Sequence, residues 1–204
     1  MYVVFAYYHF LTPPDVLQDV AQYIKEHKKF LETKDARGRI YINEQGINGQ
    51  MSIHENDAES YITWLHSHPV FKNVEIKVHL YEEHAFAKLT VKYRKQLVAL
   101  DAQVDLRLIG QHVSSHEWRQ MLDEKDPDTI LIDVRNDYEW KVGHFEGAIL
   151  PELESFRDFN EYIDHLKQLY DAKKTKVMMY CTGGIRCELY SALMKQKGFD
   201  TNMD

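Results

Sequence analysis

The stretch that decides the fold of the second half of this chain is Lys176-Val-Met-Met-Tyr-Cys-Thr-Gly-Gly-Ile-Arg-Cys-Glu188. It opens with an apolar run that is typical of a buried strand, and a helix is predicted to follow from about Cys187 to Lys197. The loop between them begins with Cys181. In open α/β sheets, ligands and reacting groups lie at the carboxyl ends of the parallel strands. The pattern therefore predicts a strand–loop–helix unit with Cys181 at the functional end of the strand.

Three features of this loop favour the thiolate form of Cys181. Gly183 and Gly184 allow backbone amides to turn toward the sulfur, and the next helix directs the partial positive charge of its N-terminus to the same place. Arg186 adds a full positive charge. Because the thiolate is the nucleophilic form of cysteine, we predict that Cys181 is catalytic rather than a buried structural cysteine. The residues predicted to form its active-site loop are Thr182, Gly183, Gly184, Ile185, Arg186 and Cys187.

The length of the loop restricts the class of enzyme to which Cys181 can belong. Four residues separate Cys181 from Arg186, and the position after five residues is Cys187. Phosphatases with a cysteine nucleophile have the longer C-x5-R loop, which makes room for a tetrahedral phosphate. The shorter loop resembles that of rhodaneses, in which the sulfur carries a persulfide.

The residues upstream of this loop also resemble the rhodanese pattern. Asp133-Val-Arg135, then Glu139, then Gly143-His-Phe-Glu-Gly-Ala148 match D-V-R, a following glutamate and G-H-x-x-G-A in the same order. We expect Asp133 and Arg135 to fix loops as a buried pair, and His144 to orient a loop or to titrate near the site. Residues 114–204 are thus predicted to form an α/β rhodanese-like domain with a central parallel sheet.

The first half of the chain has a different pattern, in which short β-branched and aromatic runs alternate with two helical segments. The helices are predicted to begin near Thr12-Pro13 and near Asn56. The order β-α-β-β-α-β predicts an α+β domain of the ferredoxin-like (acylphosphatase-like) type over residues 1–100. Such a domain has a four-stranded antiparallel sheet with both helices on one face, and one more strand is expected within 88–99. Residues 101–113 have no strong periodicity and are predicted to be a connector.

Two features of this first half have both a functional and a structural interpretation. The amides of Gly46-Ile-Asn-Gly49 either bind a phosphate or belong to a strand connection that needs flexible residues. A basic cluster near Tyr93 either holds a tRNA phosphate backbone or protects a solvated edge strand. The members of the basic cluster are Lys88, Lys92, Arg94 and Lys95.

Composition and charge restrict the class of protein. The 204 residues carry a formal net charge of −7. Residues 1–95 hold 12 cations and 12 anions, whereas residues 96–204 hold 13 and 20, so the whole excess of acid lies in the second half. An RNA-binding surface is therefore expected on the first half. Two cysteines are too few for a disulfide framework, no apolar run approaches the ~20 residues of a membrane span, and no signal peptide opens the chain. A cytoplasmic protein without membrane contact is expected.

Together, the two halves resemble the bacterial tRNA uridine hydroxylase family, whose members contain a rhodanese domain. The resemblance rests on Asn43-Glu-Gln-Gly-Ile-Asn-Gly49 and on Cys181-Thr-Gly-Gly-Ile-Arg-Cys-Glu188. It implies oxygen-dependent conversion of the wobble uridine of tRNA to 5-hydroxyuridine, with Cys181 as the active-site cysteine. It implies tRNA as partner and molecular oxygen as co-substrate. We expect no metal or other cofactor, because no flavin, haem or dinucleotide motif occurs, and no protein partner is predicted.

The resemblance also bears on the end of the chain. Members of the family continue with another strand and a cysteine-rich tail, whereas this sequence stops at Met203-Asp204, where that strand is expected to run. The rhodanese domain is therefore expected to be truncated at its C-terminus.

Other functions fit parts of the sequence. A sulfurtransferase that carries a persulfide on Cys181 fits the loop equally well. A non-catalytic scaffold does not need the intact cysteine loop, and a phosphatase needs the longer one. Cys187 lies close enough in sequence to form a disulfide with Cys181 if the loop distorts.

Overall fold

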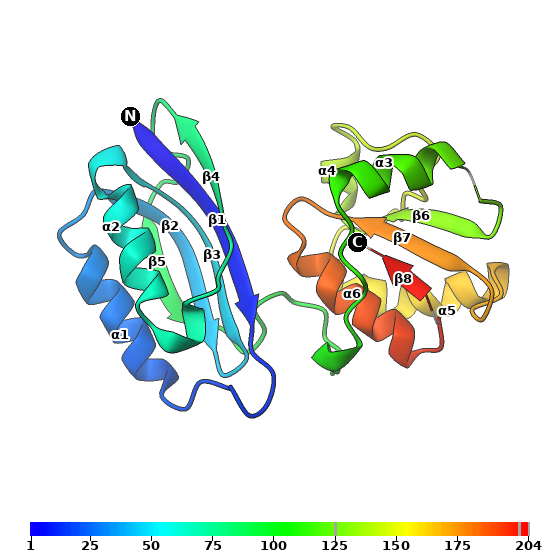
Figure 1. Cartoon of the computed structure of the whole chain (residues 1–204), viewed down its shortest axis with the longest axis horizontal. Coiled ribbons are helices and arrows are strands. Elements are labelled where there is room, and N and C mark those ends of the chain that lie inside the picture. Colours follow the sequence, from blue (N-terminus) through cyan, green and yellow to red (C-terminus); the bar gives the residue numbers. More distant parts are fainter. Residues whose placement is uncertain (125, 200, 204) are drawn as a thin grey trace. The chain divides into compact units, whose positions relative to one another are not determined.

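The computed structural model describes residues 1–124, 126–199 and 201–203, which form two compact units, Met1–Leu97 and Val98–Asp204 (Figure 1). Residues 101–113, predicted as a connector, belong to the second unit. Their short 3-10 helix Leu106–Leu108 packs on α6 (Ile185–Gln196). The amide of Gly110 donates a hydrogen bond to Oγ of Ser191 at 2.8 Å.

The first unit is built on one five-stranded mixed sheet in the order β4-β1-β3-β2-β5. The first four strands are antiparallel to their neighbours, in the ferredoxin-like arrangement that the sequence predicts. The fifth strand lies parallel to β2 at the edge. The elements are β1 (Tyr2–Phe10), α1 (Val20–Leu31), β2 (Ala36–Asn43), β3 (Gly46–His54), α2 (Glu55–His66), a 3-10 turn (Pro69–Phe71), β4 (Ile76–Tyr81) and β5 (Leu89–Tyr93).

One face of this sheet forms the core of the unit. Alternate residues of β1 (Val3, Phe5 and Tyr7) are buried with Ile40 of β2, because successive side chains of a strand point to opposite faces. Helices α1 and α2 lie on the same side of the sheet (Figure 1) and contribute Leu31, Tyr61 and Leu65 to the same core. Among the described residues of this unit, no helix lies on the opposite face of the sheet (Figure 1).

The start of α1 differs from the prediction. The helix begins at Val20, with Asp19 accepting a hydrogen bond from the amide of Gln22 at 2.9 Å, and not near Thr12-Pro13. The amides of Leu11 and Leu17 instead donate to the carbonyls of Gln45 and Glu44, in the turn between β2 and β3. Contact with a distant turn thus overrides the local capping signal.

The glycines of Gly46–Gly49 serve packing rather than phosphate binding, so the phosphate interpretation is wrong. All four residues pair with β1 as the first part of β3. Gly46 has φ +132°, and a Cβ atom there would lie 1.9 Å from the carbonyl oxygen of His9. A Cβ atom on Gly49 would lie 2.1 Å from the ring of Tyr7.

The second unit is an α/β domain around the parallel sheet β6-β7-β8, as predicted. A parallel bridge between Ile132 and Ile149 extends it beyond β6. The last strand, Thr201–Met203, pairs with β7. The elements are α3 (Ser115–Glu124), β6 (Thr129–Asp133), α4 (Asp137–Trp140), a 3-10 turn (Phe156–Asp158), α5 (Phe159–Leu169), β7 (Lys176–Tyr180), α6 and β8 (Thr201–Met203). Among the described residues, every helix is too short or too polar to cross a membrane.

Candidate active site

Cys181 follows β7 directly and opens the loop that leads into α6, as the sequence predicts. The helix begins at Ile185, and Gly184 caps it with φ +96°, a backbone conformation that favours glycine. This conformation turns the amide of Gly184 back toward the cysteine, and its N–H donates to Sγ of Cys181 over 3.0 Å. The N-terminal end of α6 therefore contacts the sulfur atom itself.

The surroundings of Cys181 hold its pKa well below the usual range of a thiol. The largest cause is a hydrogen bond from the thiol of Cys187, which is itself buried in α6. Burial acts in the opposite direction, while the charge of Arg186 and the amides of Gly183 and Cys187 lower the pKa further. Cys181 is partly exposed. An accessible thiolate with several hydrogen-bond donors is suited to nucleophilic chemistry.

Arg186 joins the cysteine loop to a distant helix. Its two terminal nitrogens donate to the two carboxylate oxygens of Glu139 at 2.6 and 2.8 Å. Thr182 completes the arrangement, since its hydroxyl donates to Glu139 at 2.9 Å and accepts from Arg186 at 3.1 Å. The charge of Arg186 is therefore held in one position beside the sulfur.

Glu139 is a residue of the site that the prediction of site residues omitted. It lies in α4, and the backbone N–H of Asn136 donates to its Oε2 at 3.1 Å. Partial burial acts to raise the pKa of Glu139, but the hydrogen bonds and charge of Arg186, with those of Thr182 and Asn136, lower it to about 2. The signal that pointed to Glu139 was its place in the rhodanese pattern, which does not reveal its partner.

Asp133 and Arg135 form the buried pair that the sequence predicts. Asp133 is fully buried at the end of β6, and its carboxylate accepts from Nε and Nη2 of Arg135 at 2.9 and 2.6 Å. Arg135 also donates to the carbonyl of Gly143 at 2.6 Å and lies over the ring of Tyr180, with 5.4 Å from Cζ to the ring centroid. The pair thus ties the ends of β6 and β7 to the loop that contains His144.

His144 lies in that loop, on the surface. Its Nδ1 is 2.9 Å from the carbonyl oxygen of Trp140, at the end of α4. The next residue, Phe145, donates its amide to the hydroxyl of Tyr180 at 3.1 Å and stacks edge-on against the same ring. These contacts position the loop.

Both halves of the chain match known protein families. Residues 2–97 match the model described as UPF0176 acylphosphatase like domain, and residues 114–203 match the rhodanese-like domain. A protein of Protochlamydia amoebophila named tRNA uridine(34) hydroxylase is 51% identical over 97% of this chain and 60% of its own length. Proteins of the same name from Chlamydia felis and Chlamydia trachomatis serovar L2 are each 50% identical, over 97% of this chain and 59% of their own lengths. Both units of the chain are thus similar to proteins named tRNA uridine(34) hydroxylase.

These matches confirm the resemblance drawn from the two sequence motifs. The match extends over both units, since 198 residues align with each of these relatives. The chain spans about 60% of the length of the relatives it matches.

The predicted basic cluster lies in the first unit, at and after β5. Lys88, Lys92, Arg94 and Lys95 are all exposed. Lys92 and Arg94 lie over the ring of Tyr41 on the neighbouring strand β2, at 5.8 and 5.1 Å from its centroid. Two of the four cations thus lie on one aromatic ring, and Cys181 lies in the other unit.

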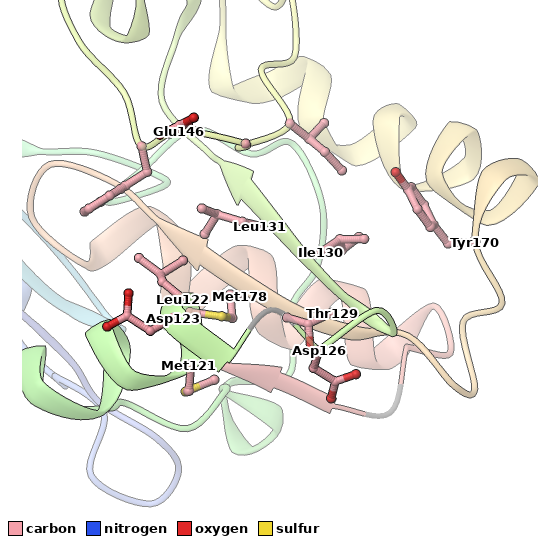
Figure 2. Close-up of a pocket in the computed structure, with 13 residues that line it drawn as sticks. Met121, Leu122, Asp123, Asp126, Thr129, Ile130, Leu131, Glu146, Tyr170 and Met178 are labelled. Atoms are coloured by element: carbon pink, nitrogen blue, oxygen red, sulfur yellow. The ribbon is translucent and has the colours of Figure 1, made fainter.

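The second unit also has a hollow of about 720 Å³ between α3, β6 and the segment 145–149. Figure 2 shows Met121 and Leu122 of α3 opposite Ile130 and Leu131 of β6, with Glu146 and Tyr170 at its border. Its lining includes none of the predicted site residues, so the hollow is separate from the cysteine loop. Over the described residues, no group of three or more histidine, cysteine, aspartate or glutamate side chains is arranged to hold a metal ion.

Proposed function

We propose that this chain provides the catalytic cysteine of a cytoplasmic tRNA uridine hydroxylase, which converts the wobble uridine to 5-hydroxyuridine with molecular oxygen. The observation that carries the proposal is the environment of Cys181. The residue is partly exposed, its sulfur accepts a hydrogen bond from the amide of Gly184, and its thiol has a lowered pKa. About 50% identity to proteins named tRNA uridine(34) hydroxylase supports this reaction.

The chemistry of uracil explains why a thiolate is useful. C5 of uracil is a poor nucleophile until a group adds to C6. Addition of the Cys181 thiolate forms an S–C6 bond and places negative charge on O4 and C5. The amides at the start of α6 and the charge of Arg186 favour anions at this place, as an oxyanion site does.

The oxygen atom enters at the activated carbon. C5 forms a bond to one atom of O2, the C5 proton is lost, and cleavage of the S–C6 bond regenerates the thiolate. Two-electron reduction then breaks the O–O bond, which leaves the hydroxyl group on C5 and releases the second oxygen atom as water. The overall balance is uridine, O2, two electrons and two protons giving 5-hydroxyuridine and water. An external thiol reductant provides the two electrons.

A complementation experiment tests the role of the cysteine. A strain that lacks the native gene receives either the wild-type gene or its Cys181→Ser variant, and nucleosides from its tRNA are measured by mass spectrometry. We expect 5-hydroxyuridine to be lost in the variant, at equal protein abundance. Growth under ¹⁸O₂ should label the new hydroxyl group. Unchanged modification in the variant would exclude Cys181 as the nucleophile.

The loop by itself also supports a sulfurtransferase. In that reaction the Cys181 thiolate attacks the sulfane sulfur of thiosulfate, sulfite leaves, and the persulfide sulfur passes to an acceptor such as cyanide. Thiocyanate formation that depends on Cys181, together with normal 5-hydroxyuridine in cells that lack the gene, would favour this function over hydroxylation.

A further inference from the structure

The sheet of the first unit has an unusual distribution of charge. None of its five strands contains aspartate or glutamate. The same strands contain Arg37, Arg39, Lys77 and Lys92, and Arg94 follows β5 directly. A surface built from these strands is therefore positive, although the first half of the chain is neutral in total.

The strand register places these cations on one face. Ala6 pairs with Lys77 on one side and with Gln50 on the other, Gln50 pairs with Arg39, and Arg39 pairs with Thr90. Directly paired residues share a face of the sheet. This row therefore crosses all five strands, over four strand spacings or roughly 19 Å. Since Phe5 and Tyr7 are buried beneath the helices, the row lies on the face opposite α1 and α2 (Figure 1).

Aromatic rings lie in the next row of the same face. Tyr8 pairs with Asn48, Asn48 with Tyr41, and Tyr41 with Lys92. The rings of Tyr8 and Phe10 are 6.0 Å apart, and Tyr41 lies beneath the charges of Lys92 and Arg94. All three aromatic side chains are partly exposed. Cations and aromatic rings thus lie in adjacent rows of the same face.

Two segments of the unit border this face and leave a strip between them. Because β4 and β5 lie at opposite edges of the sheet, residues 82–88 have to cross it, and His84 contacts Ser52 at 2.9 Å and the ring of Tyr2 at 4.0 Å. At the other end, Asn48 donates to the carbonyl of Leu97 at 3.0 Å. Gln50 and Arg39, between the two segments, are exposed.

We propose that this strip binds the single-stranded loop of an RNA, with Arg39, Lys92 and Arg94 on the phosphates and the ring of Tyr41 stacking on a base. The strands contribute cations and no carboxylate to this strip, and the carboxylates of Glu82 and Glu83 belong to the segment that borders it. Cations on the strands match a phosphate backbone, and partly exposed rings accept the unstacked bases of a loop but not those of a duplex. The proposal rests on the proposed function, for which it identifies where the anticodon loop binds.

Fluorescence anisotropy with the whole chain tests the charges. The probe is a labelled RNA hairpin with a seven-nucleotide loop. We expect Lys92→Ala/Arg94→Ala to weaken binding at least about tenfold and to reduce the salt slope by roughly 1.4, at ~0.7 for each phosphate contact. The matched control, Lys28→Ala/Lys29→Ala, removes two exposed charges from α1 and should change binding less than about twofold. An equal loss in both double variants would overturn the proposal.

The aromatic contact has its own test. Tyr41→Ala should weaken binding about tenfold, whereas Tyr41→Phe keeps the ring and should bind like the wild type. A fully paired RNA hairpin without a loop should compete poorly. Equal binding of this duplex and of the looped hairpin would contradict the proposal. If Tyr41→Ala does not fold, the binding of the Lys92→Ala/Arg94→Ala variant still tests the site. Cys181→Ser should bind the hairpin normally, so failure of the hydroxylase function and failure of this RNA site are distinguishable.

Discussion

Arg186 and Glu139, which lie 47 residues apart in the sequence, are joined by two hydrogen bonds between the guanidinium group and both carboxylate oxygens. Both side chains are mostly buried, at 15% and 21% exposed. The pair connects the cysteine loop to α4, so the position of the positive charge beside Cys181 depends on a residue outside the loop. A guanidinium–carboxylate pair with two parallel hydrogen bonds is stronger and more specific in its geometry than an ion pair with a single contact.

Removal of the Glu139 carboxylate should therefore destabilise the second unit. We expect Glu139→Ala to cost about 2–4 kcal/mol, because Arg186 keeps its charge in a partly buried place without its partner. Glu139→Gln keeps an acceptor oxygen and should cost less. Urea unfolding of the two variants measures the difference. Equal stability of wild type and Glu139→Ala would show that the pair contributes nothing measurable.

The hydrogen bond from Cys187 should control the reactivity of Cys181. In Cys187→Ala the donor is lost, so the pKa of Cys181 should rise, whereas Cys187→Ser keeps an O–H donor. The rate of alkylation by iodoacetamide as a function of pH, followed by mass spectrometry, reports the thiolate. Both variants contain a single cysteine, so the product is unambiguous. A lowered pKa keeps the Cys181 thiolate populated as pH falls. Because its pKa is higher, Cys187→Ala should lose reactivity at a higher pH than Cys187→Ser. Identical pH profiles for Ala and Ser variants would contradict this role.

The buried pair of Asp133 and Arg135 should be important for stability. Asp133→Asn leaves the charge of Arg135 only partly compensated and is expected to cost about 2–4 kcal/mol. Because Arg135 also donates to the carbonyl of Gly143, the amides of residues 141–148 should exchange hydrogen faster in Asp133→Asn than in the wild type. The control Asp123→Asn breaks an exposed pair with Arg119 and should change stability by less than about 0.5 kcal/mol.

His27 should make the first unit sensitive to acid. Burial lowers its pKa to about 4, while the unfolded chain has an ordinary value near 6.5. Between these values the unfolded state binds more protons, so stability should fall as pH decreases, by up to about 1.4 kcal/mol per pH unit. Trp64, whose ring centroid lies 4.7 Å from that of His27, reports unfolding in a Trp118→Phe/Trp140→Phe background.

Replacement of this histidine should remove the effect. In His27→Gln the slope between pH 4 and 6.5 should flatten, whereas His79→Gln, at an exposed position of β4, should leave it unchanged. A slope that persists in His27→Gln would mean that another group is responsible.

Local patterns in the sequence were enough to predict most helices and strands and the loop that begins with Cys181. The apolar run 176–180 followed by two glycines and Arg186 predicts a strand, a tight loop and a helix, and the structure contains all three. The pair Asp133–Arg135 was also predictable, because the two residues are close in sequence at the end of a strand. These predictions succeed where the determining interactions lie within a few residues of each other.

Contacts between segments that are distant in the sequence determined the features that local patterns did not predict. The start of α1 moved to Val20 because Leu11 and Leu17 bond to the β2–β3 turn, and the partner of Arg186 came from a helix 47 residues away. The open face of the first sheet was likewise outside the reach of sequence patterns, since Lys77, Gln50 and Arg39 meet only through strand register. The sequence by itself determined two domains and the position of Cys181 between a strand and a helix. Only the tertiary structure decided which side chains hold that cysteine and which cations share a surface, because hydrogen-bond partners and sheet order depend on how distant segments pack.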